Sequence, residues 1–415
     1  MYINKKLNLI LKYLICLIPM ALLTGPFIPD LFVTIISISF IYILIQEKRY
    51  QYIDNIFTKL FLIFYIYILL SSLISENIFF SLKSSIVYLR FGLFTLAVWY
   101  IIDNNKNFIR IFGIFLIISF ILALFSGFYQ YIYGETLLGV KAVNNRLLLI
   151  GSDGLLLGHY ISRLFPLLVA MLIYNLKTDY KYFILLFILF ISSDVIVFIS
   201  GERTALGLLV IASFFILIMI KKLKLFRLFT LLCSLVVVLL ISINNPSIKE
   251  RNIDYTIKQL GINQESDKIN IFSPIHESHL ITAWNIFKDY PYFGIGPNNF
   301  RKFCDKQEYQ HDEKSCTTHP HNTYIQLLSE IGIFGMLPII LVVYYLIKVS
   351  INHIIQILRQ TKTHFDDYQV CLIACFLCTL WPFFPTLNFF NNWINIIYYL
   401  PVGFFLHSIY VKKQK

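Results

Sequence analysis

Long apolar runs separated by short polar segments dominate the chain. Each run approaches the length of about 20 residues that an α-helix needs to cross a bilayer. The pattern predicts about twelve membrane-spanning helices, near residues 7–23, 29–45, 58–75, 86–102, 108–131, 157–176, 181–199, 204–220, 226–243, 323–347, 370–387 and 392–411. We therefore expect an all-α polytopic membrane protein.

One long polar stretch interrupts this pattern and divides the chain into three parts. Residues 1–243 hold the first nine predicted spans, residues 244–322 form the long loop, and residues 323–415 hold the last three spans. Within the loop we expect a short helix around Ser278–Lys288. The Gly294-x-Gly296 pair that follows lacks the strand and helix of a nucleotide-binding turn, so we expect it only to turn the backbone.

Composition and charge support a membrane protein and indicate its orientation. The chain is 58% hydrophobic and 14% charged, whereas soluble domains are about 25% charged. The first apolar run has no small-x-small cleavage site and leads directly to further spans, so no cleavable signal peptide is expected. Most Lys and Arg residues of the short loops fall on one side, which predicts that both termini are cytoplasmic and that residues 244–322 lie outside. Membrane lipids are expected partners, and nucleic acid is not.

A pair of histidines, His319 and His321, flanks a proline at the start of a long apolar run. Asn322 is a favourable N-cap, and Thr323 with Gln326 has the spacing of a capping box, so we expect a helix to begin here. The positive end of a helix disfavours a protonated imidazole, so His321 should be neutral and able to act as a general base. His319 would orient the approach. The alternative is a pair of polar surface residues.

Three arginines near the outer ends of predicted spans suggest an anion site. These are Arg90, Arg163 and Arg203. Basic residues are scarce on that side, and the arginine side chain binds phosphate oxygens in a bidentate way. We expect a pocket for a phosphate- or pyrophosphate-bearing lipid. Two alternatives stay open: Arg203 reaches lipid headgroups, or Glu202 neutralises it as a local ion pair.

Asp194 lies inside a predicted span, where a carboxylate is a candidate functional residue; we favour the alternative that it is the structural partner of an arginine on a neighbouring helix. The cysteines Cys371, Cys375 and Cys378 share one face of a predicted span, where cysteine is a small apolar residue. The histidines of the long loop, His276, His279, His311, His319 and His321, fit no common zinc spacing, so neither a metal nor another cofactor is expected.

Three motifs resemble the bacterial O-antigen ligase and O-antigen polymerase superfamily. His321-Asn322 followed by Gly332 and Gly335 resembles its histidine signature, and Ser200-Gly201-Glu202-Arg203 resembles its Ser-Gly-x-Arg turn. Pro291-x2-Gly294-x-Gly296-x3-Phe300 resembles the loop segment that precedes the histidine. The likeness extends to twelve spans and the position of the long loop, and therefore to almost the whole chain.

The resemblance implies a metal-independent, inverting glycosyltransferase of the bacterial inner membrane, with a periplasmic active site. Its donor is a glycan on undecaprenyl pyrophosphate, and the acceptor for a ligase is a sugar hydroxyl of lipid A-core. Arg203 would hold the pyrophosphate and His321 would act on the acceptor hydroxyl, with His319 and Asn322 beside them. The family's second loop arginine has no counterpart here. Histidine stands in its place, so the role falls to His276 or His279, or to Arg163 or Arg301.

Two other functions stay open. An O-antigen polymerase would use another lipid-linked glycan as its acceptor. A twelve-span transporter would show the same hydropathy, but transporters tend to have internal repeats and broken helices at mid-membrane, and the polar groups here gather at one face.

A last expectation concerns Cys304 and Cys316, the two cysteines that lie outside every predicted span. The predicted topology places them in the periplasm, where disulfides persist. Closing this loop removes roughly 3 kcal/mol of chain entropy from the unfolded segment. We predict a Cys304–Cys316 disulfide that restrains the approach to His321. The alternative is two free thiols.

Overall fold

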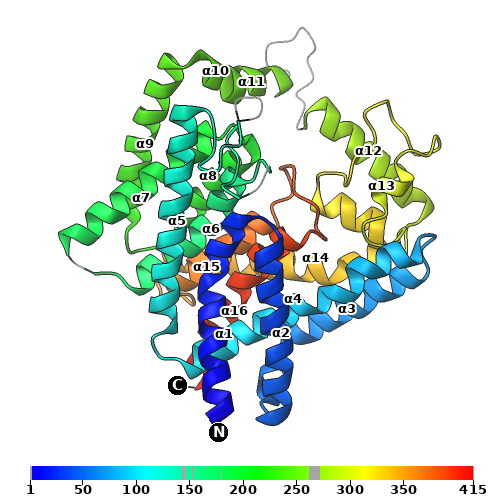
Figure 1. The fold of residues 1–415 in the computed structure, drawn as a ribbon, viewed down its shortest axis with the longest axis horizontal. Helices are drawn as coiled ribbons and strands as arrows, with labels where there is room; N and C mark the ends of the chain where they lie inside the picture. Colours follow the sequence, from blue (N-terminus) through cyan, green and yellow to red (C-terminus); the bar gives the residue numbers. More distant parts are fainter. Residues whose placement is uncertain (1, 143–145, 152–153, 178, 261–271, 415) are drawn as a thin grey trace.

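The protein, described here by a computed structural model, is built from helices (Figure 1). The structure describes residues 2–142, 146–151, 154–177, 179–260 and 272–414. The helices are α1 (Tyr2–Ala21), α2 (Phe27–Gln46), α3 (Ile56–Leu73), α4 (Ile78–Asn104), α5 (Phe108–Tyr133), α6 (Leu157–Tyr174), α7 (Tyr180–Ile199), α8 (Arg203–Met219), α9 (Lys224–Asn244), α10 (Pro246–Lys249), α11 (Tyr255–Leu260), α12 (Pro274–Asp289), α13 (Phe300–Phe303), α14 (Thr323–Leu358), α15 (Asp367–Thr379) and α16 (Asn392–Gln414). An isolated β-bridge pairs Glu135 with Lys141.

All twelve predicted spans fall on helices, but not all of these helices have the length and composition of a membrane span. In the described part of the chain, nine are long and apolar enough: α1 to α7, α9 and α14. Helices α8 and α15 are apolar but shorter. The all-α membrane fold is therefore confirmed, whereas the number of twelve spans stays a prediction.

Two predicted spans whose bounds differ from the structure contribute residues on or next to the histidine motif. Helix α14 continues to Leu358, well past the expected end near residue 347, and its backbone is non-helical at Gly332. Helix α15 ends at Thr379, not near residue 387. Pro382 and Pro385 follow, and proline cannot donate the backbone hydrogen bonds that a continuing helix needs. The chain instead forms an irregular stretch, the 380–391 segment.

Helix α6 lies at the centre of the bundle, with α5, α7, α8 and α15 packed around it (Figure 1). Every residue from Leu157 to Ile173 is buried. Helix α4 packs against α2, α3 and α16 on another side of the molecule. Apolar side chains that still face outward on α3, α5, α9 and α14 are consistent with contact with lipid, because a soluble surface seldom exposes so many.

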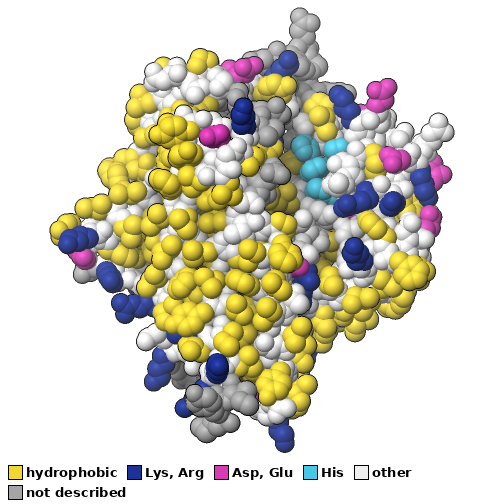
Figure 2. All heavy atoms as spheres, in the orientation of Figure 1, with side chains coloured by type: hydrophobic (Ala, Val, Ile, Leu, Met, Phe, Trp, Pro, Cys, Tyr) yellow, Lys and Arg dark blue, Asp and Glu magenta, His cyan; other side chains and the backbone are white. Residues whose placement is uncertain are grey.

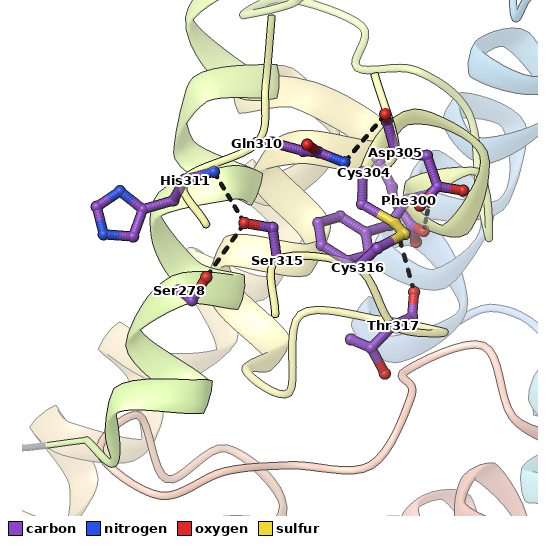
Figure 3. The surroundings of a disulfide bond; sticks show 10 residues. Ser278, Phe300, Cys304, Asp305, Gln310, His311, Ser315, Cys316 and Thr317 are labelled. Atoms are coloured by element: carbon purple, nitrogen blue, oxygen red, sulfur yellow. Dashed lines mark hydrogen bonds between the residues drawn. A yellow bond between two sulfur atoms is a disulfide. The ribbon is translucent and has the colours of Figure 1, made fainter. Parts of the chain in front are cut away.

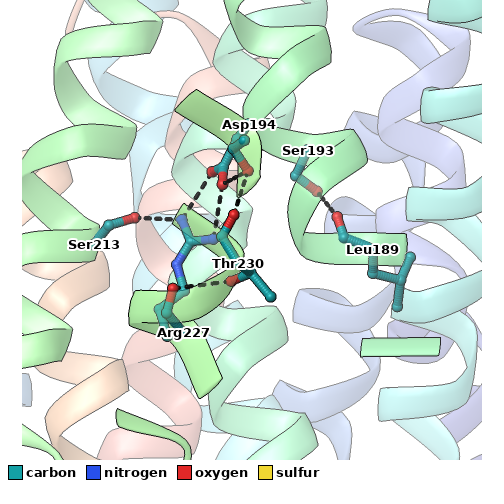
Figure 4. Close-up of polar contacts among 7 residues, drawn as sticks. Leu189, Ser193, Asp194, Ser213, Arg227 and Thr230 are labelled. Carbon is teal, nitrogen blue, oxygen red and sulfur yellow. Dashed lines mark hydrogen bonds and ion pairs between the residues drawn. The ribbon is translucent and has the colours of Figure 1, made fainter. Parts of the chain in front are cut away.

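The buried charge predicted at Asp194 is paired, as expected, with an arginine of a neighbouring helix (Figure 4). Both terminal nitrogens of Arg227 on α9 donate to the Asp194 carboxylate at 2.8 Å. Ser213 of α8 accepts from the same guanidinium at 2.7 Å, and Ser234 donates to Asp194 at 2.8 Å. The pair therefore ties α7, α8 and α9 together, which makes its role structural.

The described residues of the long loop, 245–260 and 272–322, lie at one end of the bundle, and we call them the loop face (Figure 1). It carries α10 to α13, and α12 packs against α14. Its small core contains Ala283, Ile286, Phe300 and Phe303. The expected helix near Ser278–Lys288 is α12. The loop face is the layer on which the histidines lie.

Candidate active site

The turn before α13 fixes the loop layer to the beginning of α14. The backbone N–H groups of Ile295 and Gly296 donate to the carbonyls of Ser329 and Glu330, at 3.1 and 2.7 Å. Gly294 and Gly332 have positive φ values of 67° and 70°. A Cβ atom at either position would lie 2.2–2.3 Å from the backbone of the other segment. Close backbone contact between the two segments therefore explains both glycines, and the positive φ of Gly294 agrees with the backbone turn that the sequence predicted.

Asn322 is the N-cap of α14, as predicted. Its side-chain oxygen accepts from the backbone N–H groups of Tyr324 and Ile325, at 3.0 and 3.2 Å. The predicted capping box is wrong, because the Gln326 side chain does not return to the helix start. Its amide donates instead to Glu330 and to Asn388 of the 380–391 segment, at 3.0 and 2.8 Å. The Gln326 side chain therefore bonds to the 380–391 segment and does not complete a capping box.

His321 adopts a left-handed backbone conformation, with φ of 56°. This conformation costs a residue other than glycine on the order of 1 kcal/mol, so neighbouring contacts must hold it. The backbone N–H of Thr386 donates to the His321 carbonyl at 2.7 Å. Thr386 therefore anchors the most important residue of the motif from a distant part of the chain.

Four histidines form one cluster on the loop face, and Figure 2 shows histidine side chains gathered in a hollow with Lys and Arg nearby. The His321 ring lies 4.1 Å from that of His319, 5.2 Å from that of His276 and 5.5 Å from that of His279, measured between ring centroids. Two elements supply them, because His276 and His279 are on α12 and the others precede α14. The structure thus brings all four predicted histidines together.

The hydrogen bonds of His319 fix its tautomer. Its Nε2 faces the carbonyl of Thr386 at 3.1 Å, and a carbonyl can only accept, so Nε2 carries the proton. Its Nδ1 accepts from the hydroxyl of Thr318 at 2.9 Å. With both nitrogens engaged, His319 is suited to holding the approach in place, and that role stays a prediction.

The environment lowers the pKa of the clustered histidines and keeps them neutral at pH 7. Burial lowers the pKa of His321 to about 3, helped by His319, His276 and His279, while the Thr386 carbonyl opposes the shift. Burial also lowers the pKa of His276 to about 4, with contributions from His279 and Arg203. The expectation that His321 is neutral agrees with this, but burial and neighbouring rings are the cause, and the helix dipole is not needed.

Arg203, at the first position of α8, lies beside the cluster. Its positive charge is among the causes of the lowered pKa of His276. Its guanidinium donates to the hydroxyl of Thr256 at 3.4 Å and lies 6.0 Å from the ring centroid of Tyr255. No described carboxylate forms an ion pair with it. Arg203 therefore offers an uncompensated charge next to the histidines.

Two further arginines, Arg146 and Arg251, are the cationic neighbours of Arg203. Burial lowers the pKa of Arg146, the Glu202 carboxylate raises it, and Arg251 lowers it. The Nε atoms of both are buried without a hydrogen-bond partner in the described structure. Three like charges held together with free donors form a site suited to a multiply charged anion. Sequence analysis had placed neither Arg146 nor Arg251 in the candidate site.

The Glu202 carboxylate does not pair with Arg203, so that alternative is wrong. It accepts from the backbone N–H groups of Gly158 and His159 at the start of α6, at 3.1 and 3.2 Å. These N–H groups have no partner within their own helix, and a carboxylate at this position satisfies them. Glu202 therefore caps α6 and leaves Arg203 available.

The other two predicted arginines lie elsewhere. Arg90 forms an ion pair with Asp30 of α2 at 2.7 Å, so its charge is already compensated. Arg163 is buried in α6, donates to the carbonyl of Cys378 at 3.0 Å and stacks 5.4 Å from the Tyr398 ring centroid. In the described part of the chain, neither forms a hydrogen bond, an ion pair or a ring contact with the clustered histidines, and we leave both out of the proposed binding site.

The structure contains the predicted disulfide between Cys304 and Cys316 (Figure 3), whose Cα atoms lie 4.8 Å apart. The enclosed loop also contacts α12. Ser278 donates to Asp312 at 2.6 Å, and its oxygen lies 3.2 Å from the hydroxyl of Ser315. The disulfide therefore supports the helix that carries His276 and His279 as well as the approach to His321.

Among the described residues, one group of His, Cys, Asp and Glu side chains is close enough to suggest a metal site: Cys304, Asp305 and Cys316. Both of its cysteines are used in the disulfide, which removes the thiolates that a metal would need. The other cysteines are free, and Cys371, Cys375 and Cys378 are buried.

Comparison with known families agrees with this site. A family model described as O-antigen ligase matches residues 184–340. The match supports the resemblance to the O-antigen ligase superfamily that the motifs indicate. It covers Arg203 and all four clustered histidines. A search of curated proteins finds none that matches the chain.

Members of the O-antigen ligase superfamily are glycosyltransferase-like membrane enzymes of lipopolysaccharide synthesis, and they act on a lipid-linked glycan and an acceptor. The matched region ends before the 380–391 segment, which nevertheless holds the histidine motif in place. Sequence analysis placed Thr386 within the predicted span 370–387 and therefore did not identify it as a site residue. The closely spaced Pro382 and Pro385 were the available signal that the helix ends early.

Proposed function

We propose that the protein transfers a glycan from undecaprenyl pyrophosphate to a sugar hydroxyl of lipid A-core, at the loop face. The observation that carries this proposal is the position of the histidine cluster beside Arg203, Arg146 and Arg251. Neutral histidines offer a base, and the three arginines offer donors for a pyrophosphate.

Each residue has a defined part in the proposed reaction. Arg203, with Arg146 and Arg251, binds the pyrophosphate and stabilises the negative charge that develops as it leaves. His321 accepts the proton of the acceptor hydroxyl. The hydroxyl oxygen forms a bond to the anomeric carbon while the bond to the phosphate oxygen breaks, and that oxygen keeps the electron pair. Attack from the opposite face inverts the anomeric centre.

The lowered pKa of His321 describes the protein without its substrate. A bound pyrophosphate places negative charge near His276 and raises the pKa of the neighbouring histidines, because opposite charges favour protonation. When the donor is bound, the pKa of His321 thus rises toward the operating pH, where a general base is most effective. Proton transfer to free solvent is unnecessary, and in this proposal no metal takes part.

We infer that the loop face is periplasmic. A persistent disulfide suits an oxidising compartment, and the basic residues of the short loops are concentrated at the other ends of the helices. The inner membrane follows from the proposed donor, which is a lipid carrier of that membrane. The termini then lie in the cytoplasm.

The test is reconstitution of the purified protein with an undecaprenyl-pyrophosphate-linked glycan and lipid A-core, followed by mass spectrometry of the products. We expect glycan joined to lipid A-core together with free undecaprenyl pyrophosphate. If the glycan grows on the lipid carrier and lipid A-core stays unmodified, the protein is a polymerase and the ligase proposal is wrong. A deletion strain gives the same distinction, because a ligase defect leaves long chains on the carrier.

A further inference from the structure

A second polar pocket lies beside the active-site elements, between α4, α13 and the 380–391 segment. Its volume is about 290 Å³. Two cationic side chains and several amides line it, among them Lys83, Asn298, Arg301, Asn388, Asn391 and Asn392. The pocket therefore combines positive charge with groups that both donate and accept hydrogen bonds, and the mechanism above assigns it no part.

The amides of this pocket are held in place by a chain of hydrogen bonds. Asn298 donates to Ser84 at 2.6 Å, and Asn388 donates to Asn298 at 2.8 Å. Gln326 of α14 donates in turn to Asn388 at 2.8 Å. The chain continues to Glu330, to which Gln326 also donates. The floor of the pocket is therefore joined to the helix whose N-cap follows His321.

Neither cation of the pocket forms a close ion pair, although the charge of Arg301 also acts on the buried Glu330 carboxyl. No described carboxylate lies within ion-pair distance of Lys83 or Arg301. The Nε atom of Arg301 is buried and has no hydrogen-bond partner among the described residues. Burying an arginine donor without a partner is costly, so a ligand that accepts from it is expected to bind here.

The pocket and the proposed pyrophosphate site lie on different sides of the histidine cluster. The charge of Arg301 acts on His319, whereas the charge of Arg203 acts on His276. His321 lies between these two histidines, 4.1 Å from one ring and 5.2 Å from the other. The pyrophosphate site and the second pocket therefore approach the base from different sides, as a donor and an acceptor must.

We propose that the pocket lined by Lys83, Arg301 and the asparagines binds an anionic saccharide, one that carries a phosphate or a carboxylate, as part of the acceptor. Amides pair with sugar hydroxyls, and the two cations select the charged group. The acceptor role rests on the proposed function, but the binding itself does not. A phosphate at this position has two sources, a phosphorylated sugar or a lipid headgroup, and the experiment separates them.

The test is saturation-transfer NMR on the full-length protein in phosphatidylcholine nanodiscs, with glucose 6-phosphate, glucuronate and glucose as probes. Both charged sugars should bind more tightly than glucose. Arg301→Gln and Lys83→Gln, on two different helices, should each weaken binding of the charged sugars roughly tenfold, as loss of one charge-assisted hydrogen bond does. Lys302→Gln is the matched control, because Lys302 is exposed on the same short helix and does not line the pocket.

Three results would overturn the proposal: equal binding of glucose and the charged sugars, no binding, or binding that both variants leave unchanged. A headgroup site is the answer if phosphatidylglycerol in the nanodisc displaces the charged sugars, and that result also contradicts the saccharide assignment. His321→Ala should bind all probes normally. Probe binding and glycan transfer are measured separately in this variant. A failure of the pocket proposal, seen in probe binding, can therefore be told from a failure of the proposed function, seen in transfer.

The transfer reaction provides an independent readout. Arg301→Gln should raise the KM for the acceptor and leave the KM for the donor unchanged, because the donor pyrophosphate is assigned to Arg203. A change confined to the donor KM would contradict the acceptor role. A melting curve for each variant shows whether the fold is retained.

Discussion

The backbone N–H of Thr386 donates a hydrogen bond of 2.7 Å to the carbonyl of His321, across 65 residues of chain. The carbonyl of the same residue accepts from His319, and its hydroxyl accepts from Thr323 at 3.1 Å. One residue of an irregular segment therefore holds the motif before, at and after the proposed base. These contacts explain how His321 retains a left-handed backbone.

The contacts of Thr386 predict that its backbone matters more than its side chain. Thr386→Val removes only the hydroxyl bond and should lower kcat slightly. Thr386→Pro removes the N–H that holds His321 and should lower kcat by at least tenfold, the effect of about 1.4 kcal/mol on the barrier. Equal kcat values for the two variants, with both folded by melting curve, would show that this backbone bond does not position the base.

Arg203 should not tolerate replacement by lysine. Arg203→Lys keeps the charge but loses the bidentate geometry, so it should weaken donor binding nearly as much as Arg203→Ala does, roughly 10- to 100-fold. The measurement is the dissociation constant of the undecaprenyl-pyrophosphate-linked donor. Arg359→Lys, at an exposed position after α14, is the control. Full donor binding by Arg203→Lys would reduce Arg203 to a membrane-surface anchor.

The disulfide should be required for the correct position of the histidines. Cys304→Ser and Cys316→Ser should each lower transfer, since the enclosed loop supports α12 through Ser278. The loss of loop constraint is expected to cost roughly 3 kcal/mol of loop stability. Alkylation of the wild type by a membrane-impermeant maleimide, without reduction, should leave both cysteines unlabelled. Cys233→Ser, which changes a free cysteine of α9, should retain activity.

The kcat/KM of transfer should not fall on mild acidification, as it would for a base with the ordinary pKa of histidine. The free protein needs a neutral His321, and burial together with the other histidines lowers its pKa to about 3. Acidification from about pH 7.5 to 5.5 therefore leaves the base neutral, and kcat/KM should stay flat. A histidine with the ordinary pKa of about 6.5 would lose roughly tenfold by the end of this range. A half-maximal rate near pH 6.5 would contradict the buried, neutral cluster.

The sequence predicted the parts of the protein that depend on local signals. Hydropathy located the helices, and Asn322 marked the start of α14 because capping is a contact between near neighbours. The isolation of Cys304 and Cys316 in a polar stretch predicted their disulfide. Asp194 was correctly read as the structural partner of a buried arginine.

The features that the sequence missed depend on contacts between distant parts of the chain. Gln326 has the right spacing for a capping box, but Asn388, 62 residues later, takes its amide. Arg251 joins Arg203 only because α10 and α11 fold back towards α8. The early end of α15 was masked by apolar residues that continue past it, since hydropathy reports burial and not helical structure.

The central claim is that His321 acts as the base in glycan transfer. The most direct measurement is the single-turnover rate of the reconstituted protein with donor bound, for wild type, His321→Ala and His311→Ala, with donor affinity measured separately. His311 is an exposed histidine of the same loop and serves as the matched control. We expect His321→Ala to bind donor normally and to lose at least a hundredfold in rate, within the 10²–10⁴-fold range typical of general bases. A folded His321→Ala protein that transfers glycan as fast as His311→Ala would contradict the account.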